Sequence, residues 1–140
     1  VKNTALELLS KSKEPSRLDK IPADELTCKE IAFAAKAGDH ISKKAFETAG
    51  EYLGAALANL VAVVSPEAIF LCGGVANAGD LIMSPTKRAM EKNVLPLWKG
   101  RVKLTFSSLE YENAPILGAA ALAIKEIEKK SVVVARRKVF

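Results

Sequence analysis

The stretch AIFLCGGVANAGD occupies residues 68–80 and decides the fold expected for this chain. Its first five residues are apolar and follow a proline, which is typical of a short strand buried on both faces. Gly73 and Gly74 come next, and a helix is expected to begin near residue 79 or 80. Two glycines leave no Cβ at the carboxyl end of a strand, where α/β proteins bind ligands, and a helix N-terminus offers free N–H groups. A nucleotide site is therefore one interpretation. An ordinary strand-to-helix turn has the same spacing, so both interpretations stay open.

Helical periodicity predicts three helices before this strand. They are expected over residues 2–13, 28–37 and 40–64. Thr27, with an acidic residue three positions later, forms a capping box for the second helix, and Asp39 can cap the third. The third helix carries no charge over residues 52–64, so this half is expected to be enclosed on nearly every side. Gly50 and Gly54 in its interior are destabilising by themselves and predict a close packing partner.

A second strand-helix pair is predicted after the two glycines. The expected elements are a helix over 80–94, a strand over 102–107 and a helix over 114–130. Pro85 falls inside the first of these, so a restart or kink is expected at Ser84-Pro85. The strand-helix-strand order implies a right-handed parallel crossover. The fold class is therefore α/β, helix-rich, with two parallel strands; because two strands alone do not make a stable sheet, the rest of the sheet is expected to come from outside this chain.

The composition predicts one packed core, since 49% of the 140 residues are hydrophobic and 26% are charged. The longest uncharged stretch, residues 52–66, is shorter than the roughly 18 residues that a membrane helix needs, so no membrane association is expected. The net charge is +5, but residues 125–140 hold six Lys or Arg and two Glu. The basic excess therefore belongs to one end of the chain, and a nucleic-acid surface is not expected.

Two cysteines, Cys28 and Cys72, are too few for a disulfide framework and fit a reducing compartment, so a cytoplasmic location is expected. Cys72 ends an apolar strand and is expected to be a buried, inert thiol. With His40 as the one histidine, no tetrahedral zinc site can be assembled from this sequence.

Four blocks in order resemble the ROK sugar kinases and repressors, of the actin, hexokinase and Hsp70 ATPase superfamily. The blocks are GAALA at 54–58, SPEAI at 65–69, LCGGVA at 71–76 and ILGAAA at 116–121. The resemblance covers about residues 2–128 and favours the glucokinase-like members. It implies a helix-rich partial C-terminal lobe of the actin-like (ribonuclease H-like) fold over residues 1–130, followed by a basic tail over 131–140.

The resemblance also implies a function. In the family the Gly-Gly turn lies against the adenosine and phosphates of ATP, which points to Gly73 and Gly74, with Val75 and Asn77 as neighbours. It further implies an ATP-dependent hexose kinase, acting on glucose with Mg²⁺, that forms a homo-oligomer. The family's Asp-x-Gly-x-Thr phosphate loop, its Asn-Asp catalytic pair and its Gly-His sugar motif are not found in these 140 residues. They are expected before Val1, so the chain alone is expected to be inactive and to have no catalytic residue or metal ligand of its own.

Two other functions stay open. The first is the sugar-sensing lobe of a ROK transcriptional repressor, which an N-terminal helix-turn-helix would identify. The second is a non-catalytic helical oligomerisation segment. If residues 131–140 were extended, they could pair with a sheet edge and promote association.

Overall fold

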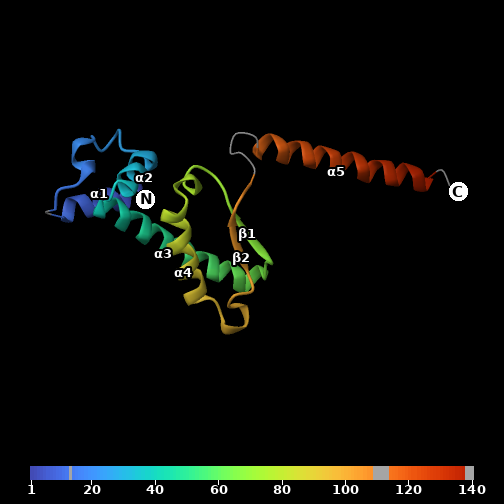
Figure 1. Cartoon of the computed structure of the whole chain (residues 1–140). Helices are drawn as coiled ribbons and strands as arrows, with labels where there is room; N and C mark the ends of the chain where they lie inside the picture. The colour runs from blue at the N-terminus through green and yellow to red at the C-terminus, as the bar shows by residue number, and fades with distance from the viewer. Residues whose placement is uncertain (13, 109–113, 138–140) are drawn as a thin grey trace. The chain divides into compact units, whose positions relative to one another are not determined.

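The computed structural model describes residues 1–12, 14–108 and 114–137 and forms two compact units, Val1–Phe106 and Ser107–Phe140 (Figure 1). The first unit contains four helices, three 3₁₀ turns and a two-stranded sheet. In order these are α1 (Lys2–Lys11), η1 (Arg17–Lys20), α2 (Cys28–Lys36), α3 (His40–Val64), β1 (Ala68–Leu71), η2 (Ala76–Ala78), α4 (Asp80–Asn93), η3 (Pro96–Trp98) and β2 (Lys103–Phe106). The described part of the second unit is α5 (Ala114–Arg137). None of the helices in the described residues is long and apolar enough to cross a bilayer.

The helix starts predicted from capping residues are confirmed. The Thr27 backbone N–H donates to the Glu30 carboxylate at 2.9 Å, and the Glu30 N–H donates back to the Thr27 hydroxyl, which fixes the start of α2. Asp39 accepts the Ser42 N–H at 2.8 Å and caps α3. Gly38, at φ +98°, provides the left-handed residue between these helices.

Two parallel strands and a crossover helix are present as predicted. Strand β1 pairs with β2 from Ala68 opposite Lys103 to Leu71 opposite Phe106, and α4 lies on the connection between them. Helix α4 is continuous through Pro85, so the restart expected there is wrong. Pro85 is buried against Gly50 of α3, and this packing offsets the hydrogen bond that proline removes from the helix.

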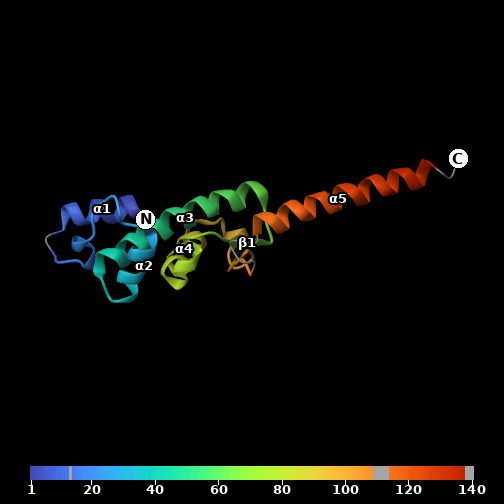
Figure 2. The same cartoon turned by 90° about the horizontal axis from the view of Figure 1, so that it is seen from above.

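Helices α3 and α4 cross at the two interior glycines, which confirms the close packing partner (Figures 1 and 2). A Cβ at Gly50 would lie 2.5 Å from the Cγ of Pro85, and one at Gly54 would lie 2.3 Å from the carbonyl oxygen of Thr86. Only glycine lets the backbones approach this closely. The crossing holds the turn between β1 and α4 in a fixed place relative to α3.

Two hydrophobic clusters flank this crossing. The first joins α1, α2 and the start of α3 around Leu18, Ile31 and Phe46, each of which is almost fully buried. The second joins the end of α3 to α4 and the sheet, with Val61 and Met90 at its centre. Each is a sizeable apolar contribution to stability, at about 25 cal/mol per Å² of buried surface.

The prediction that the charge-free half of α3 is enclosed on nearly every side is wrong. Tyr52 is 75% exposed and Val63 is 83% exposed, while Leu57 and Val61 are buried against α4 and the sheet. Strand β1 is likewise covered less than expected, because Phe70 is 63% exposed. Only one side of each element has a neighbour within the described residues, so only that side is buried.

Helix α5 runs to Arg137, beyond the end predicted at Lys130. No Gly or Pro follows Lys130 up to that residue, so nothing in the backbone ends the helix earlier. Residues 131–137 are therefore helical, and the extended alternative for the basic tail is wrong over that range. The boundary between a ROK segment at 1–130 and a tail at 131–140 stays a prediction.

Candidate functional site

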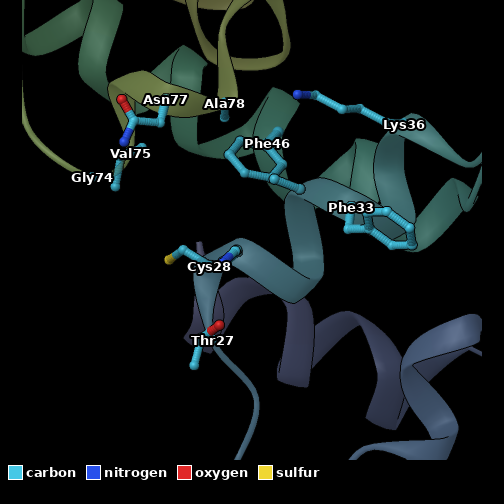
Figure 3. A pocket seen from close by; sticks show the side chains of 11 residues that line it. Thr27, Cys28, Phe33, Lys36, Phe46, Gly74, Val75, Asn77 and Ala78 are labelled. Atoms are coloured by element: carbon cyan, nitrogen blue, oxygen red, sulfur yellow. The ribbon is translucent and has the colours of Figure 1, made fainter.

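The Gly-Gly turn forms one wall of a pocket of about 690 Å³ in the first unit (Figure 3). This wall is lined by Gly74, Val75, Asn77 and Ala78. Three of the four predicted site residues are thus brought together, while Gly73 lies just before the lining, in the turn itself. We refer to this cavity as the turn pocket.

Backbone geometry sets the shape of this wall. Gly73 adopts φ +90°, which an L-residue rarely adopts, and the chain then enters the 3₁₀ turn η2. The Ala76 N–H donates to the Gly73 carbonyl at 3.0 Å, and the Ala78 N–H donates to the Val75 carbonyl at 3.1 Å. Helix α4 begins only after Gly79, at φ +64°. The sequence predicted the glycine turn and the later helix start but missed the intervening 3₁₀ turn.

The opposite wall comes from α2, and the buried ring of Phe46 on α3 lies between the two walls. The lining residues on this side are the N-cap residue Thr27 and, on α2, Cys28, Lys29, Ala32, Phe33 and Lys36. Figure 3 shows the Cys28 side chain directed toward the turn, and the Lys36 side chain extending toward Ala78. Sequence reasoning missed this wall because about 40 residues separate α2 from the turn, and no local pattern links them.

The turn pocket combines apolar surface with positive charge. Phe33, which is 74% exposed, and the buried Phe46 supply aromatic surface. Lys29 and Lys36 are the charged side chains of the lining, and within the described residues no carboxylate lines it. A planar apolar group joined to an anion fits this combination, since the ring can pack on aromatic side chains while the anion meets ammonium groups.

The other sequence candidates lie elsewhere. Cys72 is exposed, so the expectation of a buried thiol is wrong; it follows the last residue of β1 and has left the sheet. His40 is exposed at the start of α3. No group of three His, Cys, Asp or Glu able to hold a metal ion occurs among residues 1–12, 14–108 and 114–137.

Comparison with known proteins places this architecture in a family. Residues 2–126 match the ROK family. A glucokinase of Halalkalibacterium halodurans is 39% identical over 71 residues, which are 51% of this chain and 22% of that protein. The DNA-binding transcriptional dual regulator NagC of Escherichia coli K12 is 25% identical over 103 residues, which are 74% of this chain and 25% of that protein.

Solved structures agree with the predicted fold. A putative sugar kinase from Cytophaga hutchinsonii superposes with a TM-score of 0.77 at 30% identity, covering 87% of this chain and 40% of that one. A ROK family glucokinase from Streptomyces griseus, in complex with glucose and AMPPNP, gives a TM-score of 0.76 at 25% identity, covering 86% and 40%. The expected helix-rich part of an actin-like ATPase fold is thereby confirmed. The chain spans about a quarter of the two curated relatives and two fifths of these structures. With a family match over residues 2–126, this chain belongs to the ROK family.

Proposed function

We propose that this chain supplies the nucleotide-binding wall of a cytoplasmic, ATP-dependent hexose kinase that acts on glucose. The observation that carries the proposal is the turn pocket, in which a glycine turn faces two lysines and two aromatic rings. Gly74 leaves the backbone open to a ligand, because a Cβ there would meet nothing within 4 Å. The glucokinase from Streptomyces griseus, similar over 86% of this chain, was crystallised with glucose and AMPPNP and supports this assignment.

In this proposal the chain binds and orients ATP and takes no direct part in the chemistry. Apolar contact with Phe33 would hold the base, and the ammonium groups of Lys29 and Lys36 would attract the phosphates. Phosphoryl transfer also needs a carboxylate that accepts the proton of the sugar hydroxyl and a Mg²⁺ ion at the phosphates. No carboxylate among the described residues lines the turn pocket, so we expect the 140-residue chain to bind ATP without transferring phosphate.

Calorimetric titration of ATP into the 140-residue chain tests the proposal. In the variant Gly74→Leu the added Cβ meets nothing within 4 Å, and the rest of the side chain would take space on the pocket wall, so we expect at least a roughly tenfold weaker affinity for ATP. Gly118→Leu is the matched control, since a Cβ at Gly118 on α5 also meets nothing within 4 Å. Circular dichroism verifies that both variants fold. The proposal is wrong if the wild-type chain binds no ATP, or if Gly74→Leu binds it as well as the control.

A second measurement tests the expected inactivity. Glucose-dependent release of ADP, followed with a coupled assay, should not exceed a blank without protein. Turnover well above that blank would show that the chain carries catalytic groups that the turn pocket does not reveal.

The sugar-sensing lobe of a ROK regulator is the second candidate, favoured by 25% identity to NagC over 103 residues. A regulator that responds to a sugar has no need of a phosphoryl donor, so ATP binding in the titration would favour the kinase. A helix-turn-helix before residue 1 in the full-length sequence would favour the regulator.

A further inference from the structure

We propose that Asn77 reads the nucleobase in the turn pocket and makes the site select adenine over guanine. The inference rests on the proposed nucleotide function and goes beyond it, because it names the side chain that distinguishes ATP from GTP. Asn77 lies on η2 and lines the pocket, and Figure 3 shows its amide beside Val75 and Gly74, on the wall across from Cys28.

An adenine reader must accept a hydrogen bond from the 6-amino group and donate one to N7. A side-chain amide does both, since it carries a carbonyl oxygen and an NH₂ group. Guanine presents two acceptors, O6 and N7, at the same edge, so one half of the amide would face an unmatched partner. An amide in this position therefore discriminates between the two purines.

Other side chains of the turn pocket cannot take this role. The Thr27 hydroxyl is engaged by Glu30, to which it donates and from whose N–H it accepts. Lys29 and Lys36 carry only donors, so they cannot accept the 6-amino hydrogen. Cys28 offers a thiol, which is a weak donor and a weak acceptor.

Three backbone carbonyls of the turn already accept hydrogen bonds. The carbonyl oxygens of Gly73, Val75 and Ala76 accept the N–H groups of Ala76, Ala78 and Gly79, respectively. The Asn77 amide has no hydrogen-bond partner within the described part of the chain, so it is free to bind a base without first breaking a contact. Asn77 is thus the strong side-chain acceptor that the lining leaves available.

Titration of ATP and GTP into wild type, Asn77→Leu and the control Asn59→Leu tests the inference. Asn59 is an exposed residue of α3 outside the turn pocket, so the same substitution there should change neither affinity. We expect wild type to bind ATP about tenfold more tightly than GTP, because a matched amide contact is worth about that factor. In Asn77→Leu, which keeps apolar contact and removes both polar groups, the two affinities should lie within about twofold of each other.

The outcomes separate the inference from the proposed function. If wild type binds ATP and GTP equally, or if Asn77→Leu keeps the preference for ATP, Asn77 is not the base reader while the pocket remains a nucleotide site. If wild type binds neither nucleotide, the proposed function fails and this inference fails with it.

Discussion

The substitution Gly54→Ala tests the physical account of the α3–α4 crossing. The added Cβ would lie 2.3 Å from the Thr86 carbonyl oxygen, 2.6 Å from the Ala89 Cβ and 2.7 Å from the Met90 backbone nitrogen. Ordinary contacts begin at 3.4 Å, so the closest pair is about 1 Å too near. Two of the three atoms belong to the backbone of α4, which means that no side-chain rotation relieves the clash and the helices must separate.

The expected free-energy change follows from two opposing effects. Overpacking of this kind costs about 1–3 kcal/mol, and the upper end applies because a gap of about 1 Å between the helices also weakens dispersion contacts around Met90. Alanine in a helix interior is about 1 kcal/mol better than glycine. We therefore expect Gly54→Ala to lower the free energy of unfolding by about 2 kcal/mol. That loss shifts the urea midpoint by about 1 M for a chain of this size.

Urea unfolding, followed by the fluorescence of Trp98, measures the change. Trp98 is the one tryptophan of the sequence and packs against the second hydrophobic cluster, so its emission reports this region. Gly118→Ala is the control, because it adds the same methyl group in open space. Far-ultraviolet circular dichroism of that control should show unchanged or slightly increased helix content. A Gly54→Ala chain as stable as wild type would refute the close-packing explanation for the two glycines.

Three further predictions concern the caps, the acid stability and the thiols. Thr27→Ala removes the capping box of α2 and should lower the free energy of unfolding by about 1 kcal/mol in the same urea assay. Burial raises the pKa of Asp39, but hydrogen bonds from Ser42, Arg17 and Ser16 outweigh it and lower that pKa to about 2. This carboxylate therefore stabilises the fold above pH 3.8 and loses its effect as the pH falls toward 2. The melting temperatures of wild type and Asp39→Asn, measured as a function of pH, should converge near pH 2. A constant difference between the two melting temperatures at every pH would contradict this. Thiol labelling with and without ATP should show protection of the half-buried Cys28 and none of the exposed Cys72; equal rates with and without ATP at Cys28 would place the nucleotide elsewhere.

Local features of the fold were predictable from the sequence. The starts of α2 and α3 depend on Thr27 and Asp39, whose side chains accept from backbone N–H groups three residues later. The strand before Gly73 and the crossover to the second strand follow from short apolar runs bounded by proline and glycine residues. A second capping box, Ser16 with Asp19 around η1, follows the same rule, but its helix is only one turn long and has no helical periodicity that would predict it.

For contacts between elements distant in sequence, the sequence predicted that a packing partner must exist but not which residues supply it. Gly50 and Gly54 indicated that something must pack closely on α3, but the sequence could not name Pro85 and Thr86 as the partners. The charge-free half of α3 indicated burial. How much of it is buried depends on which elements pack against it, and within the described residues these elements cover one side only.

The candidate site divides in the same way. By itself, the sequence determined the glycine turn at residues 73–74, because φ +90° at Gly73 is a local demand on backbone conformation that glycine meets. The four ordered blocks also determined the family. Only the tertiary structure decided that α2 faces this turn, so that Lys29, Phe33 and Lys36 share one pocket with Asn77. The physical reason is that α2 and the turn meet through the packing of α2 and α4 on α3, an interaction between surfaces distant in sequence that leaves no trace in local spacing.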